Sequence, residues 1–401
     1  MAEKKKYNLI SLFCGCGGFD KGFEKYFNVL VANDIWDSAL KTYKYNFTNT
    51  RNIIEGDITK KETKDRILNS IKKEIEKKNI DCLIGGPPCQ AYSISGNRNP
   101  NDNRGSLYKE YLEIVKKCSP KYIVMENVKG ILSMKHKKSN LNKKEEELWK
   151  KYNTITEEIN DLKLLKRKSK TYKKFIFTEK NELNYKKLKK EKKKLDKILE
   201  CSKELVINRI KNDFKILGYN VKYFVCNSAN YGVPQKRERV IIIGTNIPDI
   251  NILKPPTTHS ENGENNKKKW KSIKQAISYL EDKKEDKKIN HIFTKHKPLF
   301  IEKIKKVNYG NSLNPKFKEA NFKPHPDKPS PTVKANNGAL FLHYKNPRVM
   351  SNREIASLQS FPKDFIFQGN KGNISKQIGN AVPVGLSENI AKYIYNLLEK
   401  N

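Results

Sequence analysis

The chain has 401 residues and a formal net charge of +38, from 82 Lys and Arg residues against 44 Asp and Glu residues. It is long enough to bury a large core in about two domains, and its positive surplus favours a polyanionic partner, with nucleic acid as the first candidate. Its apolar runs fall short of the roughly 20 residues that span a bilayer, and its basic start leads directly into a Gly-rich turn. We therefore expect a cytoplasmic protein without a membrane segment or signal peptide.

Disulfide and metal chemistry are not expected. The seven cysteines include no Cys-x-x-Cys pair, and the six histidines are scattered without the spacing of metal ligands. An odd cysteine number without such pairs is typical of reduced thiols in the cytosol, so we predict no metal site.

Strand-like and helix-like segments alternate in the first third of the chain. The predicted strands are residues 7–13, 28–34, 81–86 and 121–128. The predicted helices are residues 18–27 and 37–47 and a segment around 107–115. This alternation predicts an α/β fold with a doubly wound, mostly parallel sheet that binds ligands at the carboxyl ends of its strands.

Residues 135–204 interrupt the alternation with 24 Lys and Arg against 12 Asp and Glu, and with no Gly or Pro. Apolar residues at coiled-coil spacing predict a first helix with a seam, at Leu148, Tyr152, Ile155, Ile159 and Leu162. A second charged helix is expected over about 181–217, ending at Gly218. The sequence thus predicts a basic helical hairpin, which is either a solvated insertion or a contact with the DNA backbone.

The second half begins with a predicted β-hairpin, residues 219–227 and 237–245. From 246 to 346 the periodicity fades, which indicates a smaller, loop-rich domain. A helical pattern at 387–400 is expected to pack back on the first domain. The predicted organisation is a catalytic domain at 1–245 carrying the insertion, a second domain at 246–346, and a C-terminal part at 347–401.

The segment FCGCGGF, residues 13–19, follows the first strand and opens a helix. Glycines there allow a tight turn and a close approach of backbone to ligand. Asp34 ends the second strand, where an acid can bind ribose hydroxyls, and Asp57 could bind an adenine amino group. Acids around the turn suit a cationic nucleoside better than a dinucleotide, so we expect S-adenosylmethionine as the cofactor.

The segment GGPPC places Cys89 after a strand and behind two prolines that make the turn rigid. Spacing alone also allows a buried structural thiol. Two other segments favour a reactive one, because Glu126 ends the next strand and Arg237 and Arg239 occupy alternating positions of a later strand. The sequence therefore predicts that thiol, carboxyl and guanidinium groups converge at one sheet edge.

Eight segments together resemble the cytosine-5 DNA methyltransferase family. In the family's order they are SLFCGCGGF, NDIW, GDI, GGPPCQAYSISG, MENVKG, QKRERVIIIG, REIASLQSFP and QIGNAVP. The resemblance implies that Cys89 attacks C6 of a cytosine swung out of duplex DNA, and that C5 then takes the methyl group of S-adenosylmethionine. It also implies that Glu126 holds N3 and the amino group, while Arg239, with Arg237 nearby, binds O2.

The resemblance assigns further residues. The cofactor positions are Phe13, Gly15, Gly17, Asp34, Ile35, Asp57, Ile58, Pro88, Asn380 and Val382. Gln90 and Ser93 begin a loop that would close over DNA, and the 246–346 segment would be the target-recognition region. The family further implies a monomer that modifies DNA beside a restriction endonuclease.

Three features depart from the family's pattern: Ser11 stands where many members have aspartate, Ile35 where some have an aromatic residue, and the 135–204 insertion is not general. Two alternatives remain open, a tRNA cytosine-5 methyltransferase and a non-catalytic DNA-binding homologue. An enzyme that methylates amino groups would carry a DPPY-like segment in place of GPPC.

Overall fold

The computed structural model describes residues 5–75, 79–88, 107–138, 140–172, 175–316, 320–335 and 341–400. Cys89, Gln90 and Ser93 lie outside these described residues. The chain forms two compact units. The first comprises Met1–Pro87, Glu110–Asn127 and Gly218–Asn401, and the second Pro88–Lys109 and Val128–Leu217.

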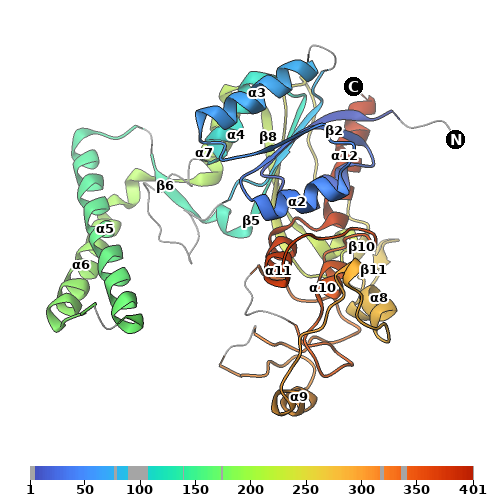
Figure 1. The fold of residues 1–401 in the computed structure, drawn as a ribbon. Helices are drawn as coiled ribbons and strands as arrows, with labels where there is room; N and C mark the ends of the chain where they lie inside the picture. Colours follow the sequence, from blue (N-terminus) through green and yellow to red (C-terminus); the bar gives the residue numbers. More distant parts are fainter. Residues whose placement is uncertain are drawn as a thin grey trace. The chain divides into compact units, whose positions relative to one another are not determined.

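A seven-stranded sheet forms the centre of the first unit, in the order β3-β2-β1-β4-β5-β9-β8 (Figure 1). Its strands are β1 (Tyr7–Leu12), β2 (Phe27–Asp34), β3 (Asn52–Glu55), β4 (Cys82–Gly85), β5 (Tyr122–Val128), β8 (Asn220–Asn227) and β9 (Glu238–Thr245). Pairing is parallel from β3 through β2, β1 and β4 to β5, whereas β8 is antiparallel to β9. The expectation of a mostly parallel α/β sheet with a final hairpin is confirmed.

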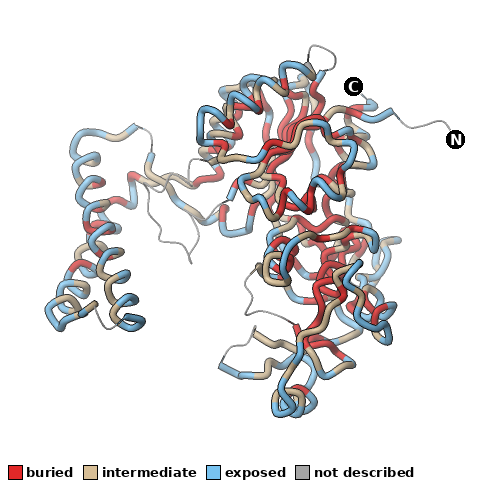
Figure 2. Tube along the Cα trace, viewed as in Figure 1, coloured by how far each residue is buried: buried red, intermediate tan, exposed pale blue. Residues whose placement is uncertain are grey.

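The strands are apolar because both faces of the sheet are covered. All four residues of β4 are buried, and Leu9, Ile10 and Leu12 of β1 have no exposed surface. Figure 2 shows this burial running along the strands. Continuous apolar runs of this kind are what parallel strands between two helical layers require.

The strand order reverses between β1 and β4, since β2 and β3 follow on one side and β5 on the other. In such sheets the ligand crevice lies outside the carboxyl ends at this reversal. The turns after Leu12 and after Gly85 both begin there, which places the Gly-rich turn and the start of the GGPP segment at the same edge.

The helices of this unit are mostly short. They are α1 (Gly18–Phe23), α2 (Asp37–Asn46), α3 (Lys61–Ile75), α8 (Ile273–Ile277), α9 (Pro298–Lys305), α10 (Asn352–Leu358), α11 (Lys371–Asn380) and α12 (Val384–Lys400), and α4 (Leu107–Cys118) crosses between the units. Helix α1 ends four residues before the predicted end at residue 27, because β2 already begins at Phe27. Ile390 and Ile394 of α12 are buried in the same core as β1.

The 246–346 segment has only short regular elements in its described part. Besides α8 and α9 these are β10 (His259–Ser260), β11 (Lys268–Lys269) and single helical turns. The segment belongs to the first unit, and its Ile273 and Ile277 enter the main core.

The second unit is dominated by two long antiparallel helices, α5 (Lys143–Thr171) and α6 (Glu179–Ile198). The predicted seam is present: Tyr152, Ile155 and Ile159 are buried together with Leu188 and Leu195 of α6. Each helix starts with a reciprocal cap, between Asn142 and Glu145 and between Thr178 and Asn181. Such caps satisfy backbone donors that the first turn leaves free. The predicted helical hairpin is confirmed.

The prediction of one second helix over about 181–217 is wrong. Helix α6 ends at Ile198, a helical turn at Leu199–Ser202 follows, and a separate helix α7 covers Val206–Ile216. Between them β7 (Lys203–Leu205) pairs antiparallel with β6 (Lys135–Lys137). We call this two-stranded pair the clasp. It ends the helix because strand pairing requires an extended backbone there.

Candidate active site

The turn after β1 has an unusual backbone. Phe13, Gly15 and Gly17 have positive φ angles of 55°, 55° and 88°. Such an angle is rare for a bulky residue like Phe13 and is typical of functional sites, where the surroundings hold the backbone. A Cβ at Gly17 would lie 2.2 Å from a ring carbon of Phe47, whereas one at Gly15 would meet nothing within 4 Å. The turn therefore packs against Phe47 at Gly17, whereas the space next to Gly15 is open.

Asp34 holds this turn to the end of β2. Its carboxylate accepts hydrogen bonds from the backbone N–H groups of Gly15 and Trp36, both at 2.8 Å. Burial raises the pKa of Asp34, and the two N–H donors oppose that shift. Next to it, Ile35 is 66% exposed. The end of β2 thus presents a fixed carboxylate and a free apolar side chain side by side.

The other predicted cofactor residues lie on two further segments. The Asp57 carboxylate follows β3 and accepts from the N–H and hydroxyl of Thr59 at 2.9 and 2.8 Å, while Ile58 is buried. Asn380 ends α11 and is exposed, and Val382 is buried. A Cβ at Gly18 would lie 2.7 Å from the carbonyl oxygen of Val382, so this segment lies against the start of α1.

Glu126 and Arg239 come together, as the sequence predicts. They lie on β5 and β9, which are neighbours in the sheet, and Arg239 Nε is 2.7 Å from Glu126 Oε1. Their side chains are only 14% and 13% exposed. The pair is therefore mostly, but not completely, removed from water, so its charges interact more strongly than those of a surface ion pair.

The turn that leads toward Cys89 lies beside this ion pair. A Cβ at Gly86 would be 3.4 Å from Glu126 Oε2. The amide of Asn127 donates to the carbonyl of Pro87 at 3.1 Å, so the residue after Glu126 fixes the first proline. Pro88 is exposed, and the predicted nucleophile Cys89 is outside the described residues.

Arg237 has contacts that the sequence does not reveal. The side chain is buried, and its guanidinium donates to the backbone carbonyls of Val333 at 2.7 Å, Gly379 at 2.9 Å and Ala381 at 3.3 Å. Burial, together with the charge of Arg239, lowers the pKa of Arg237 to about 9. Arg237 thus joins β9 to two segments far along the chain.

Other residues of the site also escape prediction. Asp20 is fully buried below the Gly-rich turn, accepts from the Tyr43 hydroxyl at 2.8 Å, and has its pKa raised to about 6 by burial. The side chain of Gln235 is buried and accepts from Val333 N–H at 3.0 Å. Their sequence signal is limited to their positions, since both lie within the segments SLFCGCGGFD and QKRER.

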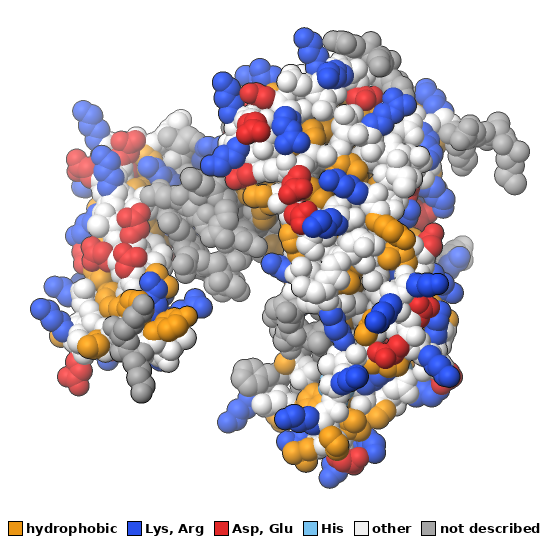
Figure 3. Space-filling view, viewed as in Figure 1, with side chains coloured by type: hydrophobic (Ala, Val, Ile, Leu, Met, Phe, Trp, Pro, Cys, Tyr) orange, Lys and Arg blue, Asp and Glu red, His pale blue; other side chains and the backbone are white. Residues whose placement is uncertain are grey.

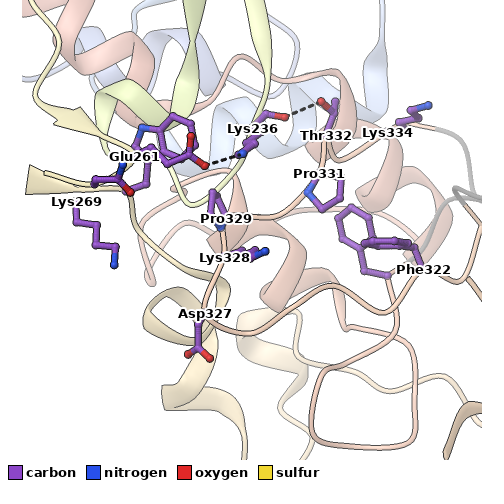
Figure 4. A pocket seen from close by; sticks show the side chains of 13 residues that line it. Lys236, Glu261, Lys269, Phe322, Asp327, Lys328, Pro329, Pro331, Thr332 and Lys334 are labelled. Carbon is purple, nitrogen blue, oxygen red and sulfur yellow. Dashed lines mark hydrogen bonds and ion pairs between the residues drawn. The ribbon is translucent and has the colours of Figure 1, made fainter. Parts of the chain in front are cut away.

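A cavity of about 880 Å³ lies in the first unit where residues 261–270, residues 327–334 and the rings of Phe322 and Phe341 meet Lys236, just before β9 (Figure 4). Its wall combines four lysines, three aromatic rings and two prolines: Lys236, Lys269, Lys328, Lys334, Trp270, Phe322, Phe341, Pro329 and Pro331. Lys236 Nζ lies 3.3 Å from Glu261 and 4.7 Å from the centre of the Trp270 ring. The Thr332 hydroxyl donates to the Lys236 carbonyl at 3.0 Å. Glu261 and Asp327 also line the cavity, so four lysines face two acids and the net charge of the wall is positive beside its aromatic rings.

Among the described residues, no group of three or more His, Cys, Asp and Glu side chains is placed to hold a metal ion. No helix in the described part of the chain has the length and apolar character needed to cross a membrane.

Comparison with known proteins identifies the family. The C-5 cytosine-specific DNA methylase family matches residues 7–153 and 196–396. The chain is 30% identical over 445 residues to the type II methyltransferase M.DdeI of Desulfomicrobium norvegicum, with 96% of this chain and 88% of that protein covered. It is 28% identical over 413 residues to M.NgoFVII of Neisseria gonorrhoeae, with 100% and 89% covered.

Two solved structures have a similar fold. A putative DNA modification methyltransferase encoded within an E. coli prophage has a TM-score of 0.65 at 21% identity, covering 98% of this chain and 100% of that one. The Entamoeba histolytica methyltransferase EhMeth has a TM-score of 0.56 at 17% identity, with 98% and 99% covered. At these identities the likeness concerns the fold alone. The family match, however, spans every strand of the sheet and both Glu126 and Arg239, so the chain belongs to the C-5 cytosine-specific DNA methylases and is a DNA (cytosine-5) methyltransferase.

Proposed function

We propose that this enzyme methylates C5 of a flipped cytosine in a specific duplex DNA sequence, through a covalent bond between Cys89 and C6. The observation that carries the proposal is the Glu126–Arg239 pair, with 2.7 Å between its charged atoms, next to the turn at Gly86 and Pro87. A carboxyl and a guanidinium at this place match the N3, amino and O2 groups of a cytosine ring.

The residues around the Gly-rich turn fit S-adenosylmethionine. The open space above Gly15, the exposed apolar surface of Ile35 and the carboxylates of Asp34 and Asp57 surround one end of the sheet. S-adenosylmethionine, when bound, supplies an activated methyl group. Asp34 would contact the ribose and Asp57 the adenine amino group. Asn380 and Val382, at the end of α11, would contact the cofactor from another side.

The proposed reaction proceeds by addition and elimination. The Cys89 thiolate adds to C6, and the electron pair of the C5–C6 double bond moves to C5, which takes the methyl group. A base then removes the C5 proton, the double bond forms again and the thiolate leaves. Glu126 would donate a hydrogen bond to N3 in its protonated form, and Arg239 would stabilise negative charge at O2.

The 246–346 segment is proposed as the target-recognition region. The cavity lined by Lys236, Lys269 and Trp270 supports this role, since cationic side chains bind phosphates and aromatic faces pack against sugars and bases. Gln90 and Ser93 would close over the DNA. Arg237 would place β9 relative to Val333 of this segment and to the cofactor side at Ala381.

The biological setting proposed is restriction–modification, with a monomeric enzyme acting in the cytoplasm on DNA that a cognate endonuclease would otherwise cut. Support comes from the relatives M.DdeI and M.NgoFVII, which are type II methyltransferases. Bisulfite sequencing of a plasmid modified in cells would identify the recognised sequence.

The deciding experiment is methyl transfer from labelled S-adenosylmethionine to duplex DNA or tRNA, followed by digestion to nucleosides. Label in 5-methyldeoxycytidine is expected, with loss of all turnover in Cys89→Ala. Duplex DNA containing 5-fluorocytosine should form a denaturation-resistant complex with the enzyme but not with this variant, because fluorine cannot leave as a proton. Label in ribonucleosides would assign a tRNA substrate instead, and turnover retained in Cys89→Ala would overturn the covalent mechanism.

A further inference from the structure

The hairpin of α5 and α6 carries its charge unevenly. The outer part, residues 163–171 of α5 and 179–187 of α6, holds eight Lys and Arg against two acids. The inner part, residues 143–162 of α5 and 188–198 of α6, holds ten lysines against eight acids. We call the outer part, with the described residues that join the two helices, the tip. A solvated face that only keeps the helices in solution would not need this separation of charge.

The strongest charge lies on one stripe of the tip. Lys163, Arg167 and Lys170 are all exposed and follow each other at helical spacings of four and three. Residues at this spacing share one face of a helix. Lys166, by contrast, pairs with Glu182 of α6 and lies 5.2 Å from the ring centre of Phe177. The stripe is thus a row of cations outside the internal packing of the hairpin.

The tip also exposes apolar side chains. The helix–helix core is made by Trp149, Tyr152, Ile155 and Ile159 of α5, by Leu188 and Leu195 of α6 and by Leu199 of the following turn. Tyr185 packs against this core at the inner end of the outer part. In the tip, Ile176, Leu183 and Tyr172 are 74%, 71% and 57% exposed. Figure 3 shows apolar and basic side chains gathered at this end of the hairpin. Cations next to exposed apolar groups match a phosphodiester backbone with its sugars.

We propose that the tip binds duplex DNA outside the recognised sequence, as a second, sequence-independent contact of the enzyme with its substrate. This inference rests on the proposed DNA substrate. The 29 residues of α5 make a helix about 44 Å long, which packs against α6 along its inner part. The tip can therefore reach phosphates several base pairs away from where the hairpin begins. A tethered second contact raises affinity for long DNA without any change in the reaction centre.

The test compares two variants that remove three charges each. K163Q/R167Q/K170Q removes the stripe, and K190Q/K193Q/K197Q removes an equivalent exposed row on the inner half of α6. Affinities of the full-length protein are measured for random-sequence duplexes of about 15 and about 45 base pairs over a range of salt concentrations. Since these side chains are exposed, circular dichroism should show unchanged helix content in both variants.

For the stripe variant we expect at least a tenfold loss of affinity for the long duplex and a salt slope smaller by about 2 to 3, at about 0.9 per lost phosphate contact. The inner variant should change the affinity for the long duplex and the salt slope by much less. I176S/L183S should weaken binding to the long duplex with an unchanged salt slope.

An unchanged slope in the stripe variant, or an equal loss in the inner variant, would overturn the proposal. So would stripe-dependent binding to anionic lipid vesicles without any effect on DNA. Because these are binding measurements, they are read independently of methyl transfer: a protein that made no 5-methyldeoxycytidine would refute the proposed function but leave this contact measurable.

Discussion

Arg237, just before β9, and Arg239, on β9, lie two residues apart, but their replacement by lysine should have different effects. The Arg237 guanidinium makes three hydrogen bonds to carbonyls of Val333, Gly379 and Ala381. A lysine at 237 offers a single nitrogen, which cannot reach all three oxygens in the planar arrangement of arginine. Arg239 contacts the Glu126 carboxylate with its Nε, and a lysine can replace much of that contact.

The expected cost for Arg237→Lys follows from the buried groups left without a partner. Each unsatisfied buried carbonyl costs about 1–3 kcal/mol, so losing one or two of the three bonds should lower the free energy of unfolding by about 3 kcal/mol. At about 2 cal/mol/K of unfolding entropy per residue, a chain of 401 residues shifts its melting temperature by about 1 °C per kcal/mol, so the melting temperature should fall by about 3–4 °C. Because the carbonyls belong to the proposed cofactor and DNA sides, KM for both substrates should rise more than kcat falls.

Arg239→Lys is the matched control. Its side chain makes no such set of bonds to buried carbonyls, and lysine keeps a positive charge opposite Glu126, so its melting temperature should stay within about 1 °C of wild type. Its kcat should fall by about 10²-fold or more, as for a lost charge-stabilising donor. Differential scanning fluorimetry and steady-state methylation kinetics measure both quantities. A wild-type melting temperature for Arg237→Lys would refute the assignment of Arg237 as the residue that holds these segments together.

Three further predictions concern carboxylates. Glu126→Gln should lower the single-turnover rate by about 10²–10³-fold with little change in DNA affinity, because the amide cannot supply the N3 proton; a rate within threefold of wild type would contradict this role. Asp34→Asn leaves either Gly15 N–H or Trp36 N–H without its acceptor. Calorimetry should therefore show S-adenosylmethionine binding about tenfold weaker, and an unchanged Kd would contradict a role of Asp34 in cofactor binding. Burial raises the pKa of Asp20 to about 6, so the folded protein binds a proton that the unfolded chain does not hold until about pH 4. The stability that this carboxyl contributes therefore rises as pH falls from about 6 to about 4. Measured by urea unfolding, the free energy of unfolding of wild type minus that of Asp20→Asn should increase by about 3 kcal/mol over this range. A difference that does not change with pH would show that Asp20 has an ordinary pKa.

Local pattern was enough to predict the sheet and the Glu126–Arg239 pair. The strands are continuous apolar runs, and Glu126 lies near the carboxyl end of its strand, where parallel neighbours bring their functional groups together. The Arg239 position followed from alternation along β9. The nucleophile proposed at Cys89 rests on the sequence, since it lies outside the described residues.

Long-range contacts account for what the sequence did not reveal. Alternation predicts Arg237 on the same strand as Arg239, but β9 begins at Glu238. The partners of Arg237 are carbonyls of residues 333, 379 and 381, which carry no side-chain signal. The end of α6 at Ile198 was missed because no Gly or Pro marks it and because the clasp depends on pairing with residues more than 60 positions earlier. The lysines around the cavity belong to different loops, so only the folded chain collects them.

In the clasp Lys135 pairs with Leu205 and His136 with Glu204, and the Lys138 N–H donates to the Ser202 carbonyl at 3.0 Å, so the two ends of the insertion meet. The family match omits residues 154–195, which lie beyond this closure. Because the two ends of the insertion already meet, the segment between them can become longer or shorter, or be replaced, at a small cost in loop-closure entropy. Related enzymes could therefore acquire arms of different reach at this position while the reaction chemistry stays unaltered.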